Sequence, residues 1–228
     1  MNVEIAAGIL LIVAPLWFNV MFTMLARRFD YPDILRQPTP AILERFQAGG
    51  PSLSLLWWAF TMSGLLLIAT AVVLGQALGD SQVLPLAVTF GILAGLVQML
   101  GLLRWVYLLP PLARAYADPS LEDDERASIL VTFRAFHQYV GVGVGEHLGY
   151  LFTGIWSLLT GAAIVLGTDL PSWLGWPGIV IGIGLIAGSG EFLGANEREG
   201  WPWAGKAVPF LYIGWSLWLL AMGIALLV

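Results

Sequence analysis

The chain has no cysteine and only two histidines among its 228 residues. Without thiols it forms neither disulfides nor thiolate-bound zinc or iron–sulfur sites. Only 11% of the residues are charged, whereas about a quarter are in a soluble domain. The net charge of −5 gives no case for a nucleic-acid partner. The sequence has no Ser–His–Asp set, phosphate-binding loop or HExxH motif, so the catalytic residues stay unknown and we predict no cofactor.

What the chain does contain is apolar sequence, at 58% of all residues. A helix needs roughly 20 apolar residues to cross a bilayer, and six stretches reach that length. These stretches are continuous rather than alternating, which favours helices over strands. We therefore predict an all-α, polytopic membrane protein, a single domain over residues 1–228. Its six transmembrane helices are expected at about 5–26, 53–78, 84–109, 121–166, 173–193 and 207–228.

All ten Lys and Arg residues fall into three patches, each after an odd-numbered apolar stretch. They are Arg27, Arg28, Arg36, Arg45, Arg104, Arg114, Arg126, Arg134, Arg198 and Lys206. Cytoplasmic loops of membrane proteins collect Lys and Arg. We therefore expect loops 27–52, 110–128 and 194–206 to be cytoplasmic. Both termini would then be periplasmic or extracellular, in a multi-pass protein of a cell inner membrane.

Proline and capping patterns predict the form of two of these loops. Four prolines between residues 27 and 52 favour an extended or lightly structured loop. Pro110 and Pro111 are expected to end the third helix. Ser120, followed by acidic residues, is the expected N-cap of the fourth helix.

The fourth helix is predicted to be unusually long, because residues 121–166 contain no proline. Such a helix would measure roughly 70 Å, over twice the thickness of the bilayer core. Counting back from Leu166 places the membrane span at about 146–166, with the earlier part extended on the cytoplasmic side. Glycines between Gly141 and Gly145 allow either a bend or the close approach of a neighbouring helix.

The same depth count brings four ionisable residues to one inner layer. Arg104 lies 20 residues past Leu84, and Glu191 lies 18 residues past Trp173. Both are therefore roughly 30 Å from the outer interface, as are Glu146 and His147. Ionisable residues at such a depth face the bundle or a water-filled pocket, and they pair. The candidate partners of Arg104 are Glu146 and Glu191. By the same count, the polar residues Asn19 and Gln98 lie about 21 Å from the outer interface.

Two interpretations of this layer remain open, a structural ion-pair cluster and a pocket open to the cytoplasm. For the pocket, Tyr139, Glu146, Tyr150 and Thr153 share one face of an α-helix. The depth count places four tryptophans near the middle of the bilayer: Trp17, Trp156, Trp215 and Trp218. They would line an apolar cavity on the outer side of the polar layer. The candidate ligand-binding residues are therefore Arg104, Tyr139, Glu146, His147, Tyr150, Trp156 and Glu191.

A metal centre is not predicted. The two histidines, His137 and His147, are ten residues apart on one predicted helix, about 15 Å along its axis. Two ligands of one haem iron stand only about 4 Å apart, so one haem cannot take both.

Two longer motifs resemble a known family. They are Leu103-Arg-Trp-Val-Tyr-Leu-Leu-Pro110 and His137-Gln-Tyr-Val-Gly-Val-Gly-Val-Gly-Glu-His-Leu-Gly-Tyr150. Both are similar to signatures of a bacterial family of integral membrane proteins, a domain of unknown function of the 4386 type. Pro171–Trp176 and Trp215–Trp218 resemble its last two helices. The resemblance implies a bacterial inner-membrane protein, and it implies no particular activity.

Three function classes follow from these observations. The first is a protein that contacts membrane lipids and binds a small amphipathic or lipid-like ligand in a cytoplasm-facing pocket. The second is an intramembrane enzyme acting on a lipid or isoprenoid, with Glu146 or His147 as acid–base. The third is a small transporter, which the lack of paired proline-broken helices disfavours. The first class requires the fewest special sequence features. The sequence leaves the oligomeric state open.

Overall fold

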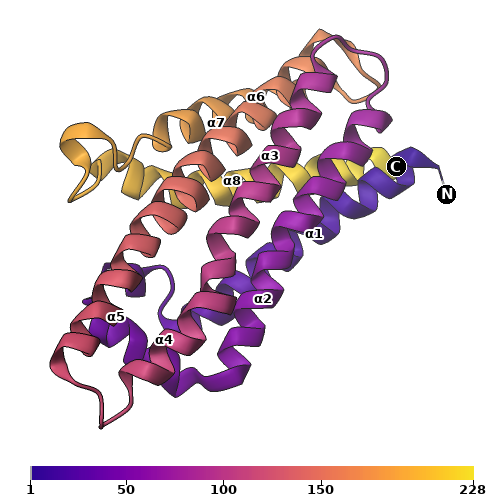
Figure 1. The fold of residues 1–228 in the computed structure, drawn as a ribbon. Helices are drawn as coiled ribbons and strands as arrows, with labels where there is room; N and C mark the ends of the chain where they lie inside the picture. The colour runs from indigo at the N-terminus through magenta and orange to yellow at the C-terminus, as the bar shows by residue number, and fades with distance from the viewer. Residues whose placement is uncertain (1) are drawn as a thin grey trace.

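The computed structural model describes residues 2–228, and this part of the chain is all-helical, with 85% helix and no strands (Figure 1). The all-α prediction is therefore confirmed. In chain order the elements are α1 (Val3–Phe29), η1 (Asp33–Arg36), α2 (Thr39–Ala77), α3 (Leu84–Leu103), η2 (Arg104–Leu108), α4 (Leu109–Tyr116), α5 (Asp123–Phe136), η3 (His137–Leu148), α6 (Gly149–Gly167), η4 (Ser172–Leu174), α7 (Gly175–Gly188), η5 (Gly194–Asn196) and α8 (Pro202–Leu227).

Five helical runs are long and apolar enough to cross a membrane, judged by length and composition. They are Val3–Phe29, Thr39–Ala77, Leu84–Tyr116, Asp123–Gly167 and Pro202–Leu227. A sixth run, Ser172–Gly188, is apolar but shorter. The chain therefore has the helix composition of a multi-pass membrane protein. The N- and C-termini lie close together at one end of the bundle, with α4 and α5 at the opposite end (Figure 1).

The predicted loop 27–52 is largely helical, which corrects the expectation of extended chain. Helix α2 begins at Thr39, with Pro40 in its first turn, where the missing N–H costs no hydrogen bond. A kink separates its two parts at Gly50, whose φ is 58°. Glycine adopts this positive φ at no steric cost, so Pro51 begins a new helical stretch instead of ending the chain's helix.

Three other predicted helix ends are also wrong. Pro110 and Pro111 do not stop the third helix, because they occupy the first turn of α4, which continues to Tyr116. The N-cap of α5 is Glu122, paired with Glu125 in a capping box, rather than Ser120. Helix α7 ends at Gly188, and turns replace the last residues of the predicted span 173–193.

Helices α5, η3 and α6 follow one another without a break over 45 residues, Asp123–Gly167. Their middle part, η3, is a π-helix, in which each backbone N–H bonds to the carbonyl five residues earlier instead of four. Here the glycines permit close approach: a Cβ built on Gly101 of α3 would lie 2.5 Å from Cα of Gly145. The backbones of α3 and η3 therefore touch at this pair, and a side chain at either position would separate them.

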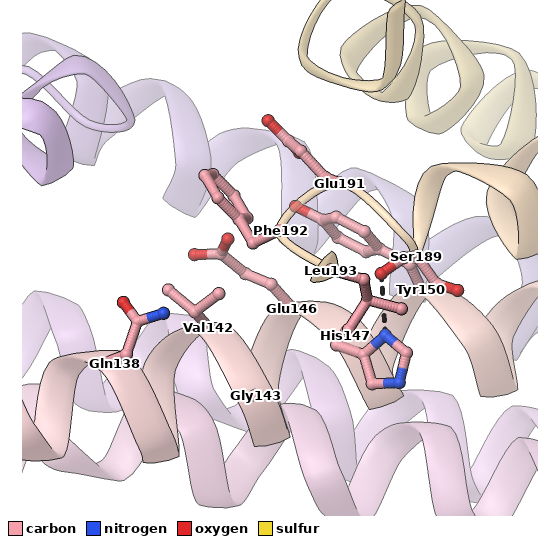
Figure 2. Close-up of a pocket in the computed structure, with 10 residues that line it drawn as sticks. All are labelled: Gln138, Val142, Gly143, Glu146, His147, Tyr150, Ser189, Glu191, Phe192 and Leu193. Atoms are coloured by element: carbon pink, nitrogen blue, oxygen red, sulfur yellow. Dashed lines mark hydrogen bonds between the residues drawn. The ribbon is translucent and has the colours of Figure 1, made fainter. Parts of the chain in front are cut away.

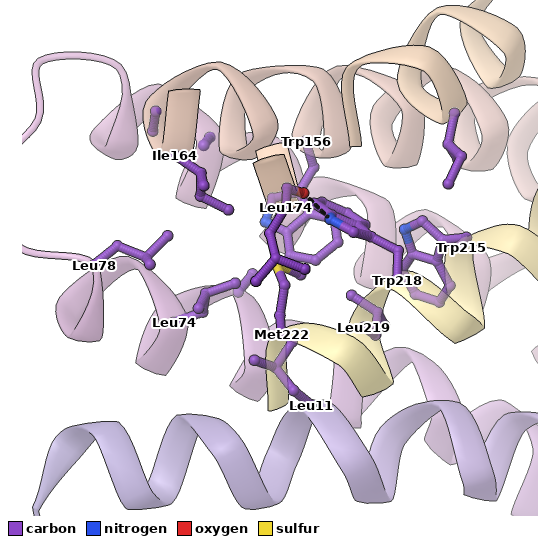
Figure 3. Packing of buried hydrophobic residues seen from close by; sticks show 14 of the residues in the cluster. Leu11, Leu74, Leu78, Trp156, Ile164, Leu174, Trp215, Trp218, Leu219 and Met222 are labelled. Carbon is purple, nitrogen blue, oxygen red and sulfur yellow. Dashed lines mark hydrogen bonds between the residues drawn. The ribbon is translucent and has the colours of Figure 1, made fainter. Parts of the chain in front are cut away.

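Two apolar clusters form the core. The Trp156 cluster gathers Leu11, Leu74, Trp156, Trp215, Trp218 and neighbouring residues from six helices (Figure 3). The Trp105 cluster contains Phe29, Phe46, Trp57, Trp105 and Phe133 among others. Within it the indoles of Trp57 and Trp105 stack, with ring centroids 4.5 Å apart and an interplanar angle of 8°. Most aromatic residues of the candidate site belong to these two clusters or pack against them.

Candidate functional site

A cavity of about 310 Å³ lies among α1, α2, α3, η2, η3, α6 and α8, and we call it the inner cavity. Its aromatic lining consists of Phe18, Phe22, Tyr31, Phe60, Tyr150 and Tyr212. Its polar lining consists of Asn19, Ser63, Gln98, Arg104 and Glu146. The inner cavity therefore combines a largely apolar wall with two charged side chains, as ligand sites commonly do.

Arg104 is buried in this wall, with 8% of its surface exposed. Its Nη1 donates a hydrogen bond to the carbonyl oxygen of Gly101, and its Nε has no hydrogen-bond partner. Its guanidinium carbon lies 5.1 Å from the ring centroid of Trp105, in cation–π range. A buried guanidinium with an unpartnered N–H is costly, so Arg104 is poised to bind an acceptor.

The expected ion pair between Arg104 and Glu146 or Glu191 is not formed, which corrects that prediction. Residues 2–228 contain two ion pairs, Arg36–Glu191 and Arg45–Asp30. Glu146 lines the same cavity as Arg104 but lies beyond salt-bridge distance from it. The two charges therefore face one space without neutralising each other directly.

The glycines of η3 make room for the Arg104 side chain. A Cβ built on Gly141 would lie 2.7 Å from the guanidinium carbon of Arg104. The guanidinium thus rests directly on the backbone of η3. The Gly141–Gly145 segment that the sequence indicated as a bend or a packing surface therefore also seats the cationic residue of the cavity.

A second, smaller pocket of about 120 Å³ opens between η3 and the turns after α7 (Figure 2). We call it the vestibule. It is lined by Gln138, Val142, Gly143, Glu146, His147, Tyr150, Ser189, Glu191, Phe192 and Leu193. Glu146 and Tyr150 line both the vestibule and the inner cavity. These two side chains therefore form the shared wall between them.

The other two ionisable residues of the predicted layer lie in the vestibule. Nδ1 of His147 donates to the carbonyl oxygen of Ser189 over 2.7 Å, drawn as the dashed line in Figure 2. Oε1 of Glu191 lies 3.5 Å from Nη2 of Arg36. Arg36 comes from η1, so this contact joins the segment after α1 to the segment after α7. The four ionisable residues of the predicted layer therefore divide between two adjoining pockets.

Tyr139 does not join the site. Its side chain is 74% exposed, and it lines neither the inner cavity nor the vestibule. The predicted face assumed about 3.6 residues per turn from Tyr139 to Thr153. Because η3 is π-helical, that spacing does not hold before Leu148. Glu146 and Tyr150 stay on the cavity side, whereas Tyr139 turns away from it.

Trp156 belongs to the core and lines neither pocket, which corrects its assignment to the site. It is 1% exposed and packs against Trp215 and Trp218, with ring centroids 5.9 and 6.0 Å away (Figure 3). Nε1 of Trp215 donates to Oγ of Ser157, and Nε1 of Trp218 donates to the carbonyl oxygen of Leu174. Buried partners for their indole N–H groups therefore explain the mid-depth positions of Trp215 and Trp218.

Apart from Tyr150, the aromatic residues that line the inner cavity were not predicted. Phe18 and Phe22 flank Asn19 at a spacing of four on α1, a pattern that any apolar helix shares. Tyr31 lies in the turn after α1 and reaches the cavity only through the fold. Gln98, which the depth count did find, donates to Oγ1 of Thr153 over 2.9 Å. Among residues 2–228, no group of three His, Asp or Glu side chains is arranged to hold a metal ion.

The fold and the apolar helices thus define an all-helical membrane protein with an internal cavity. Residues 6–223 match the family described as "Domain of unknown function (DUF4386)". The chain belongs to this family, which confirms the resemblance of its motifs. No curated protein and no solved structure matches the chain.

Proposed function

We propose that this protein binds a small amphipathic or lipid-like molecule in the inner cavity. The observation that carries the proposal is the Arg104 guanidinium, which lies buried on the cavity wall without a carboxylate partner. An acceptor on the ligand would bind this guanidinium, and the phenyl rings of Phe18, Phe22 and Phe60 would contact an apolar tail. The ligand would enter by way of the vestibule, past Glu146 and Tyr150.

The π-helical geometry on both sides of the cavity supports this proposal. Arg104 begins η2, and Glu146 lies within η3. π-Helical turns are rare, and they occur frequently at functional sites. Two such segments against one cavity are more readily explained by a ligand than by packing alone. The intramembrane enzyme and the transporter have no comparable support among residues 2–228.

We also propose that the chain crosses the membrane six times, with Ser172–Gly188 as the short fifth crossing and only about 146–166 of the fourth helix inside the bilayer. Loops 27–52, 110–128 and 194–206 would face the cytoplasm of a cell with an inner membrane. Support comes from the three Lys and Arg patches and from the two termini, which lie at the same end of the bundle (Figure 1).

The topology predicts the behaviour of reporter fusions. Alkaline phosphatase fused after Val228 is expected to be active and a green fluorescent protein there to be dark, because both would be exported. The same reporters inserted in loop 110–128 are expected to give the opposite pair of results. Activity of the phosphatase in that loop, or fluorescence at the C-terminus, would reject the orientation.

The proposed ligand is tested by native mass spectrometry of gently solubilised protein. The wild type is expected to carry a lipid-like mass that Arg104→Gln loses, because the variant lacks the cationic donor. Arg114→Gln is the matched control: it makes the same charge change at an exposed position and should retain the mass. A wild type without bound mass, or equal retention in Arg104→Gln, would contradict the proposal.

A further inference from the structure

We infer that the ligand of the inner cavity is a single-chain amphiphile whose head has no net charge and presents an acceptor to Arg104 and a donor to Glu146. This inference rests on the proposed function and specifies its ligand class. Arg104 and Glu146 are the two charged residues that line the inner cavity. A guanidinium only donates hydrogen bonds, whereas a carboxylate only accepts them. The head that satisfies both must therefore carry both kinds of group.

The separation of the two charges leaves room for such a head. Arg104 and Glu146 line one cavity, yet they form no ion pair within 4.0 Å. Helix α3, which leads directly into η2, contacts the backbone of η3 where Gly101 meets Gly145, and the Arg104 guanidinium rests on Gly141 of η3. The two side chains thus line one space at a separation of more than 4.0 Å, which the backbone contact helps to fix. A head with a donor and an acceptor bridges that spacing.

The surrounding charges disfavour an anionic head. In the adjoining vestibule, Glu191 is paired with Arg36, and Nδ1 of His147 donates to the carbonyl oxygen of Ser189. An ionised Glu146 offsets the charge of Arg104, and the two residues then carry no net charge. A fatty-acid anion or a phosphate ester would meet Arg104 favourably but would bring negative charge toward Glu146. Like charges repel strongly where water is excluded, so such a ligand loses affinity.

The size of the cavity favours one chain over two. A cavity of about 310 Å³ lies at the lower end of the range of about 300–1,000 Å³ that small-molecule sites span. This room accommodates a small head and the first part of one tail. The two chains of a membrane phospholipid do not fit. Phe18, Phe22 and Phe60 provide the apolar contacts that one tail requires.

The test compares probes of one chain length in detergent-free nanodiscs. The probes are decanoate, decylamine and two net-neutral molecules, 1,2-decanediol and the zwitterion 2-aminodecanoate. Native mass spectrometry would give the affinity of each for the wild type. We expect at least one net-neutral probe to bind about tenfold tighter than either singly charged probe. The two net-neutral probes also distinguish an uncharged head from a zwitterionic one.

Two variants show whether Glu146 and Arg104 set this preference. Glu146→Gln keeps the shape of the side chain and is expected to raise decanoate affinity about tenfold and to lower decylamine affinity. Arg104→Gln is expected to do the reverse, and Arg114→Gln should change neither. If decanoate binds the wild type tightest and Glu146→Gln leaves its affinity unchanged, the inference is wrong while the proposed function stands. If no probe binds the wild type, the proposed function fails as well.

Discussion

Gly101→Ala is expected to lower the free energy of unfolding by about 3 kcal/mol, near the upper end for overpacking of a well-packed interior. The reason is that the new Cβ would lie 2.5 Å from Cα of Gly145, and backbone atoms cannot move aside as a flexible side chain does. Helices α3 and η3 would have to separate. Because Gly101 also lines the inner cavity, the separation would displace the segments that carry Arg104 and Glu146.

Gly143→Ala is the matched control for this prediction. Gly143 lies in the same π-helical segment, and the nearest atom to a Cβ built there is 3.8 Å away. The substitution is therefore expected to change stability by less than about 0.5 kcal/mol or to raise it slightly. Reversible unfolding in mixed micelles measures both variants. Equal stability of the two would show that the Gly101–Gly145 contact does not hold α3 against η3.

Trp156→Ala is expected to cost about 3–5 kcal/mol of unfolding free energy and to leave ligand binding intact in the folded fraction. Trp156 is 1% exposed, and its removal would leave a cavity among Trp215, Trp218 and Gly91. In a membrane, packing rather than water exclusion stabilises helix contacts, so lost contacts are not replaced cheaply. The inner cavity does not include Trp156, so its lining stays the same.

Trp176→Ala provides the comparison. Because Trp176 is 58% exposed, this substitution should lower the free energy of unfolding much less. Thermal unfolding and native mass spectrometry on the same samples separate stability from binding. If Trp156→Ala lost the bound mass at an unchanged melting temperature, Trp156 would be part of the ligand site after all. Similar destabilisation by the two variants would show that the Trp156 cluster is not a tightly packed core.

The features that the sequence could predict are those that depend only on the residues of a single helix. A membrane helix satisfies its own backbone hydrogen bonds, so a long apolar run is a helix whatever its neighbours are. The depth count on single helices also found the inner polar layer. Arg104 and Glu146 line the inner cavity, and Glu146, His147 and Glu191 line the vestibule. Rise per residue alone was enough for this result, because helices that cross one membrane start from common levels.

The helix ends were less predictable, because proline and glycine act through context. Pro110 and Pro111 were expected to stop a helix, yet they fit the first turn of α4 after the π-helical η2. Pro51 likewise follows the kink at Gly50 instead of ending α2. Proline is tolerated wherever its missing N–H is not needed, and only the three-dimensional path of the chain shows where that is.

By itself, the sequence determined the helical class and the family. Only the tertiary structure decided which side chains share a space. The π-helical turns of η3 moved Tyr139 out to the surface and kept Glu146 and Tyr150 on the cavity wall. Glu191 forms an ion pair with Arg36 of η1, which is far from it in the sequence. Arg104 is therefore left without a carboxylate partner. The physical reason is that hydropathy acts residue by residue, whereas helix register and charge pairing depend on neighbours brought together by packing.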